Sequence, residues 1–176
     1  YDQKLKVVKL KSMAETLLFI QKHDFADFDA LSDYADAASG RTKELTAKIK
    51  AAESRMAEIA VLKTHIINYA KTRDIYTAYR KAGYSKKYYD AHESDIIIHK
   101  AAKKAFDELA LKKLPTVKSL QAEYSDLLVQ KKLDYAALAK AREEARQLQI
   151  YKANAEMLLR TDADEQRQTR EHQQEK

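Results

Sequence analysis

Residues 45–69 read LTAKIKAAESRMAEIAVLKTHIINY, and this stretch decides the fold class. Its apolar side chains recur every three or four residues, which places them on one face of an α-helix and is typical of a coiled-coil seam. The same spacing predicts one helix over residues 41–82, because Gly83 is a good C-terminal stop. A helix of that length, about 60 Å, is stable only against a partner of similar length.

A second seam follows Pro115 and supplies that partner. Thr116 is a candidate N-cap for a helix over residues 116–160. Its apolar positions recur at helical spacing: Val117, Leu120, Tyr124, Leu127, Leu128, Tyr135, Leu138, Ala145, Leu148, Ala155 and Leu159. We expect the two helices to pair antiparallel, since each hides the apolar stripe of the other from water. The predicted class is therefore all-α, a long antiparallel coiled-coil-like helical hairpin with a small helical head and short N-terminal helices.

The segment 1–40 is predicted to form the N-terminal helices, packed at the base of the hairpin. Apolar residues at helical spacing indicate an amphipathic helix over residues 7–23. Asp27 is a plausible N-cap for a second helix that starts at Phe28. Gly40 is the candidate break after this helix, although one glycine costs a helix only about 1 kcal/mol relative to alanine.

Two further segments complete the predicted organisation. Residues 83–115 are predicted to form the helical head, with Ser85 and Ser94 as successive N-caps. The tail, residues 161–176, is almost entirely polar and has no apolar period. We expect this tail to be disordered.

The composition excludes several classes of protein. The chain has 176 residues with only two glycines and one proline, far fewer than a sheet protein needs for its turns. It has no cysteine, which excludes disulfides, thiolate catalysis and thiolate metal sites and favours the cytoplasm. The chain has no run of about 18 apolar residues, which a membrane-spanning helix needs, so we expect no membrane insertion. Because the chain begins with tyrosine, we expect it to be a segment of a longer protein.

The net charge of +6 is concentrated in the middle of the chain. Residues 71–113 carry 11 bases against 6 acids, and six of the eleven tyrosines lie within residues 69–89. Tyrosine rings can stack on unpaired bases while lysine and arginine neutralise phosphates, so the segment is a candidate DNA-binding site. The candidate nucleic-acid-binding residues are Arg80, Lys81, Tyr84, Lys86, Lys87, Tyr88, Tyr89, Lys103 and Lys104. The alternative is that the tyrosines are seam residues and the lysines a solvated face.

No catalytic constellation is recognisable. Glycines only at positions 40 and 83 exclude a glycine-rich phosphate loop. His92 and His99 are seven residues apart with Asp95 between them, which is a weak metal pattern that a surface histidine pair explains better. We therefore predict no catalytic residue, no metal and no cofactor in this chain.

Several long runs carry a resemblance to a known family. They are AAESRMAEIAVLKTHIINYAKTR at 51–73, YRKAGYSKK at 79–87, HKAAKKAFDEL at 99–109 and LPTVKSLQAEY at 114–124. These runs resemble the C-terminal helical region of relaxases, the mobilisation nucleases of conjugative transposons and mobilisable plasmids in Gram-positive gut bacteria. Relaxases of this type have an N-terminal nuclease domain with a tyrosine nucleophile and a metal-binding histidine cluster. This chain matches neither motif, so no catalytic residue carries over.

The resemblance implies a parent protein that nicks DNA at a transfer origin and passes through a secretion channel. On that basis we expect a non-catalytic module that contributes contacts to DNA or to the relaxosome. The alternative is a protein docking module for the type IV secretion coupling protein or an accessory protein, through the acidic stretch 24–36 and the tail. Self-association through the long seams is a third possibility.

Overall fold

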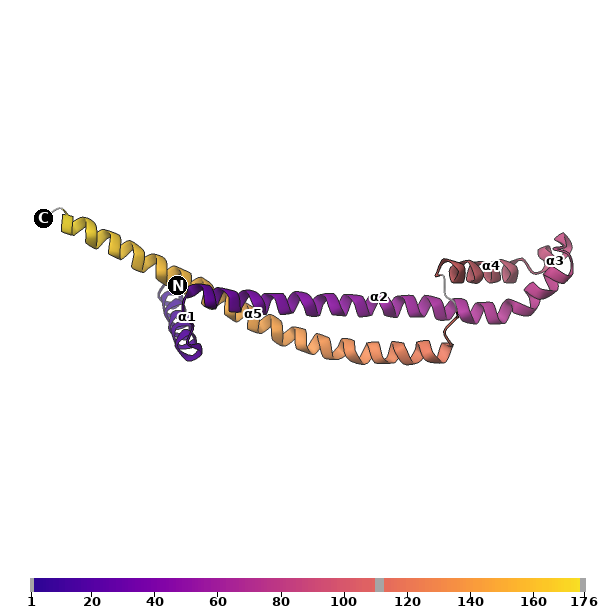
Figure 1. Ribbon diagram of the computed structural model, residues 1–176, viewed down its shortest axis with the longest axis horizontal. Coiled ribbons are helices and arrows are strands. Elements are labelled where there is room, and N and C mark those ends of the chain that lie inside the picture. The colour runs from indigo at the N-terminus through magenta and orange to yellow at the C-terminus, as the bar shows by residue number, and fades with distance from the viewer. Residues whose placement is uncertain (1, 110–112, 175–176) are drawn as a thin grey trace. The chain divides into compact units, whose positions relative to one another are not determined.

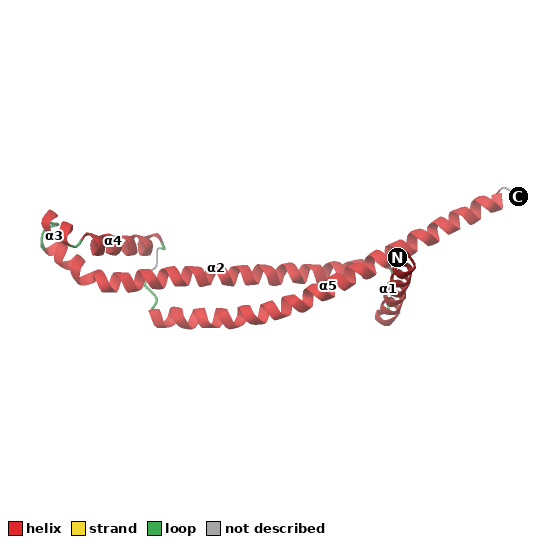
Figure 2. Ribbon diagram, turned by 180° about the vertical axis from the view of Figure 1, so that it is seen from behind, coloured by secondary structure: helices red, strands yellow, loops and turns green. Residues whose placement is uncertain are grey.

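The computed structural model describes residues 2–109 and 113–174, and within them the chain forms five helices and no strand. Their bounds are α1 Asp2–His23, α2 Phe28–Lys81, α3 Lys86–Ala91, α4 Glu93–Glu108 and α5 Val117–Gln174. Figures 1 and 2 show that short turns and loops join α1 to α2, α2 to α3 and α3 to α4. The all-α class is thus confirmed. No helix among the described residues is both long enough and apolar enough to cross a bilayer.

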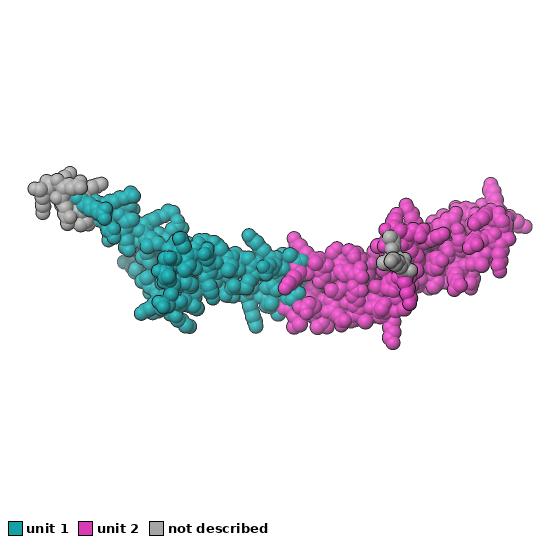
Figure 3. Space-filling view, in the orientation of Figure 1, with its two compact units in different colours: residues 1–47, 134–176 teal, residues 48–133 magenta. Residues whose placement is uncertain are grey.

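The chain divides into two compact units, and both long helices contribute to each (Figure 3). Unit 1 comprises residues 1–47 and 134–176, and unit 2 comprises residues 48–133. Within each unit a segment of α2 runs antiparallel to a segment of α5. The continuous coiled-coil-like hairpin across both units stays a prediction.

In unit 1 the antiparallel pair is held by a small core and a polar network. Ala35 and Ala38 of α2 are buried against Ala145 and Leu148 of α5. The three alanine side chains allow close approach of the two helices, and Phe19 and Tyr151 pack against this core.

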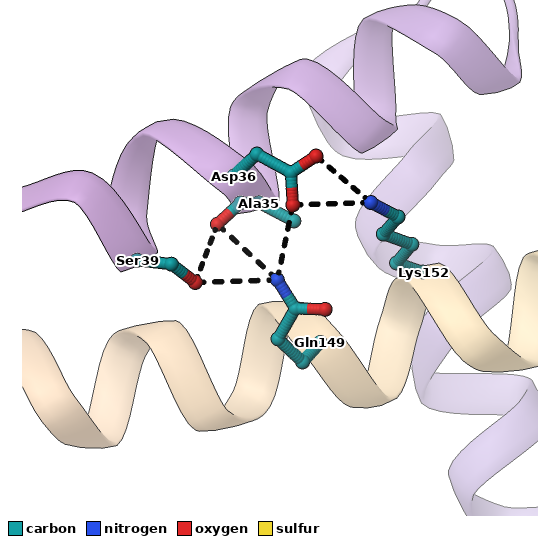
Figure 4. A network of polar contacts seen from close by, with 5 residues as sticks. All are labelled: Ala35, Asp36, Ser39, Gln149 and Lys152. Atoms are coloured by element: carbon teal, nitrogen blue, oxygen red, sulfur yellow. Dashed lines mark hydrogen bonds and ion pairs between the residues drawn. The ribbon is translucent and has the colours of Figure 1, made fainter.

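The polar network of unit 1 lies beside this core (Figure 4). Lys152 Nζ donates to both carboxylate oxygens of Asp36, at 3.0 and 2.9 Å. The Gln149 amide lies within hydrogen-bonding distance of Asp36, of Ser39 and of the Ala35 carbonyl. The hydrogen bonds from Lys152 and Gln149 lower the pKa of Asp36. Asp36 is therefore already engaged within the chain.

In unit 2 the core lies between α2, α5 and α4. Ile59, Leu62 and Leu120 are buried together, and the partly buried side chains around them are Ile66, Phe106, Tyr124 and Leu127. At the surface Arg55 makes two hydrogen bonds to Glu123, of 2.7 and 3.2 Å. Both ion-pair partners are partly exposed, so the pair contributes less to stability than the apolar core does.

The helix start and stop signals are confirmed at three positions. The Ala30 backbone N–H donates to Asp27 Oδ1 at 2.8 Å, and the Ser119 N–H donates to Thr116 Oγ1 at 3.0 Å. These bonds satisfy amide groups that have no partner within the first turn of α2 and of α5. Helix α2 ends at Lys81, immediately before the turn that contains Gly83.

Three predicted boundaries are wrong. Gly40 does not break the helix. One glycine within a helix costs less free energy than ending that helix and nucleating a second one. Helix α4 starts at Glu93 with His92 at the N-cap rather than Ser94. Its acidic residues Glu93 and Asp95 lie in the first turn, where the helix dipole stabilises negative charge.

The tail is the third case. Residues 161–174 continue α5 as helix instead of being disordered, while 175–176 lie outside the described residues. Glutamate, glutamine, arginine and alanine propagate a helix well once it is nucleated, and polarity alone does not stop it.

The predicted head, residues 83–115, has no core of its own within its described residues 83–109 and 113–115; residues 110–112 lie outside the described part. Helix α3 has no buried residue. The buried side chains of α4 are Ile96, His99 and Ala102, and α4 lies alongside α2 (Figures 1 and 2). Helices α3 and α4 therefore form a third layer on the α2 helix of unit 2.

Candidate nucleic-acid interface

The turn that follows α2 positions the first candidate residues. Gly83 and Tyr84 both have φ near +62°, the left-handed conformation. The Tyr84 N–H donates to the Tyr79 carbonyl at 3.1 Å and the Gly83 N–H to the Arg80 carbonyl at 3.1 Å. This pair of bonds is a Schellman motif, which ends the helix and brings the side chain after the glycine back onto the last turn.

Tyr79 is the centre of the tyrosine cluster. Its own ring is buried, with 8% exposed. Four other tyrosine rings have centroids within 6.3 Å of it: Tyr76 at 6.2 Å, Tyr84 at 5.2 Å, Tyr88 at 6.3 Å and Tyr89 at 6.0 Å. The Lys100 ammonium of α4 lies 5.9 Å from the centroids of both Tyr79 and Tyr89. The cluster ties α2, the turn, α3 and α4 together.

The three candidate tyrosines differ in how much ring they offer a ligand. Tyr84 is 57% exposed although its ring contacts that of Tyr79 in a perpendicular arrangement. Tyr88 and Tyr89 are half-buried. The Tyr89 hydroxyl faces Glu93. Burial raises the pKa of Tyr89, and the negative charge of Glu93 raises it further. Tyr84 therefore has the most accessible aromatic surface of the three.

The candidate cations are exposed, and most have no partner within residues 2–109 and 113–174. Lys104 lies 3.7 Å from Glu108. The other five have neither an ion pair nor a hydrogen bond from the side chain within the described part of the chain: Arg80, Lys81, Lys86, Lys87 and Lys103. Residues 79–109 contain seven bases and five acids, so the local excess of positive charge is moderate. The structure places Arg80 to Lys87 around one turn and Lys103 with Lys104 on α4.

His99 lies between two tyrosine rings beneath this surface. Its imidazole stacks on Tyr69 at 4.4 Å and on Tyr76 at 4.2 Å, and only 3% of the residue is exposed. The Thr72 hydroxyl donates to the Asn68 carbonyl, so it accepts a hydrogen bond from His99 Nδ1 at 3.0 Å. Burial, with a smaller effect of Lys103, lowers the pKa of His99. His99 is thus a neutral packing residue that anchors α4 to α2.

The weak metal pattern of His92, Asp95 and His99 is not assembled. His99 faces Thr72, whereas the His92 ring packs on Tyr88 at 4.5 Å. Among the described residues, no group of three or more histidine and carboxylate side chains is arranged to hold a metal ion.

The candidate residues named from the sequence include neither Tyr79 nor Lys100, yet these two connect the candidate residues. Tyr76 and Tyr79 are three residues apart and so share a helical face, which was a usable signal for the centre of the tyrosine cluster. The position of Lys100 above it had no local signal, because it depends on how α4 folds back. Comparisons with protein families, with curated proteins and with solved structures find no match to this chain.

Proposed function

We propose that this chain is a non-catalytic module of a conjugative relaxase, acting in the cytoplasm, and that its unit 2 contacts single-stranded DNA. The relaxase assignment is supported by the resemblance of the four sequence runs in residues 51–124. The DNA-binding role is supported by one structural observation: the turn that presents the Tyr84 ring is surrounded by four exposed and unpaired cations, and Lys103 on α4 is a fifth.

The chemistry of this surface suits unpaired bases. The exposed face of Tyr84 can stack on a base of any identity, whereas a duplex hides its base faces within the helix stack. The cations around the turn supply phosphate contacts without sequence preference. The resemblance implies a parent protein that nicks at a transfer origin and stays on the strand, so a sequence-tolerant strand contact beside the nuclease fits that context.

The test is a fluorescence anisotropy titration with a single-stranded oligonucleotide and with the duplex of the same sequence. If all five unpaired cations contact phosphates, the slope of log K against log salt is about −3.5, at about −0.7 per contact. Between about 50 and about 200 mM NaCl the single-strand affinity then falls about 130-fold. Absence of single-strand binding at the lower salt concentration refutes the proposal, and tighter binding to the duplex refutes the stacking role.

A matched pair of variants places the contact on the chain. Lys86→Ala/Lys87→Ala removes two unpaired cations of α3 and should reduce the slope by about 1.4. Lys48→Ala/Lys50→Ala removes two exposed cations from α2, about 45 Å along the helix from Arg80. This control should leave the slope unchanged. Equal effects of the two variants mean that binding follows net charge alone.

A further inference from the structure

Helix α1 has one side that packs within unit 1. The Asn154 side-chain amide of α5 donates to Ser12 Oγ and Thr16 Oγ1, both at 2.9 Å. Thr16 is fully buried, and the Phe19 ring stacks on Tyr151 at 4.5 Å. Residues 12, 16 and 19 lie on one face, so the opposite face of α1 points away from α5.

The opposite face carries an uncovered apolar stripe. Val7, Leu10, Ala14 and Leu17 follow one another at steps of three, four and three, the spacing of a helix-pairing seam. Val7 is 64% exposed, Leu10 69% and Leu17 54%, and Leu18 beside them is 66% exposed. The amphipathic helix predicted over residues 7–23 was expected to bury its large aliphatic side chains. The structure buries Thr16 instead, and the stripe is left without a partner among the described residues.

The charge on α1 beside the stripe is predominantly positive. Lys4, Lys11 and Lys22 are separated by seven and eleven residues, which places them along the same edge of the helix. Residues 3–23 contain five lysines and a single acid, Glu15. An occupant of this face therefore gains from carrying carboxylates beside its apolar residues.

The C-terminal end of the stripe opens into an apolar cleft of about 350 Å³. Leu17 belongs both to the stripe and to the cleft wall, so the two surfaces are continuous. The other main apolar walls are Ile20, Phe28, Leu31, Leu158 and Leu159. Asp27 and Asp162 also line the cleft, so a side chain that enters it must be apolar rather than acidic.

We propose that this face of α1 docks an amphipathic helix of another protein, whose apolar stripe is flanked by aspartate or glutamate. One bulky apolar side chain of that helix enters the cleft at Leu17, and its acidic edge lies along Lys4, Lys11 and Lys22. The inference does not depend on DNA binding by unit 2.

Two other occupants fit the face less well. A second copy of α1 brings five more lysines against the first five, and like charges across a helix pair are destabilising. A helix that lies in a membrane surface has leucine on its apolar face together with aromatic residues, tryptophan or phenylalanine, that anchor it at the headgroups. Here the exposed stripe is purely aliphatic, and the one phenylalanine of α1, Phe19, faces Tyr151.

The experiment uses the whole chain and a labelled synthetic helix of about three heptads, with leucine at the seam positions and glutamate beside them. A second peptide has lysine in place of every glutamate. We expect saturable binding of the glutamate peptide, measured by fluorescence anisotropy, and at least tenfold weaker binding of the lysine peptide. Lys4→Glu/Lys11→Glu should reverse that preference. Binding of neither peptide, or of both equally, overturns the proposal.

The apolar contribution is tested with Leu10→Gln/Leu17→Gln, which should weaken binding of the glutamate peptide at least tenfold. Both leucines are more than half exposed, so the variant should keep its helical circular dichroism. The matched control is Val129→Gln/Leu133→Gln, two 60%-exposed aliphatic residues of unit 2, which should leave peptide affinity unchanged.

The remaining outcomes separate the other occupants. Suppose the chain dimerises in sedimentation experiments and Leu10→Gln/Leu17→Gln abolishes the dimer. The occupant is then a second copy, and the proposal is wrong. It is equally wrong if the chain binds phosphatidylserine vesicles through these leucines but does not bind the glutamate peptide.

Discussion

Replacing Tyr84 with asparagine separates the role of the ring from that of the backbone. Tyr84 has φ +62°, a conformation that costs an ordinary L-residue about 1–2 kcal/mol and that asparagine tolerates better. The ring contributes an edge contact with Tyr79 at 5.2 Å, worth about 0.5–1.5 kcal/mol. Because relief of strain and loss of the contact have similar size, Tyr84→Asn should change the unfolding free energy by less than about 1 kcal/mol.

The same substitution should have a large effect on DNA binding. Loss of one base-stacking ring costs about 1–3 kcal/mol, which weakens single-strand affinity about 5- to 160-fold. The assay pairs urea unfolding with the anisotropy titration at low salt concentration, and Tyr84→Phe is the control that keeps the ring.

Two results would contradict the argument. Unchanged single-strand affinity of Tyr84→Asn means that the ring does not stack on a base. A loss of more than about 2 kcal/mol in unfolding free energy means that the Tyr79 contact, rather than the left-handed backbone, dominates at this turn.

Two further predictions concern stability. The pKa of His99 is lowered in the folded state, so the unfolded chain takes up a proton first as the pH falls through its ordinary value of about 6.5. The contribution of His99 to the unfolding free energy should therefore be complete above about pH 7. At lower pH it should decrease by at most about 1.4 kcal/mol per pH unit, until His99 in the folded protein is protonated as well. The difference in unfolding free energy between wild type and His99→Gln, measured from pH 7.5 to 5, should show this slope, and a constant difference contradicts it. Gly40→Ala should stabilise the protein by about 0.5–1 kcal/mol, because Gly40 lies inside α2 and a methyl group there meets nothing within 4 Å; a lower midpoint in thermal unfolding would show that the site is not an ordinary helix interior.

Local signals in the sequence were sufficient for the helix class and for several helix ends. Asp27, Thr116 and Gly83 act on backbone groups within one turn of themselves, so their effect does not depend on distant parts of the chain. The seams were readable in part. Ile59, Leu62 and Leu120 are buried where the spacing placed them, whereas Tyr135 and Leu159 of the predicted second seam are 48% and 53% exposed.

The candidate interface was only partly accessible to sequence reasoning. The concentration of bases and tyrosines in the middle of the chain is visible in the sequence, and the exposure of Arg80 and Lys86 follows from their charge. How much of each tyrosine ring stays accessible depends on Tyr79, around which the turn, α3 and α4 fold. A tyrosine is apolar enough to be buried and polar enough to be exposed, so its type alone does not decide between the two.

The sequence by itself determined that the chain is helical, where most of its helices begin, and where its positive charge is concentrated. Tertiary structure alone decided which face of each helix is covered. On α1 the buried residue is Thr16, because Asn154, 138 residues later, satisfies its hydroxyl, while Leu10 and Leu17 stay in solvent. On α4 the buried histidine is held by Thr72 of α2. Caps and breakers act over one turn of backbone, whereas burial of a face depends on a partner from a distant part of the chain.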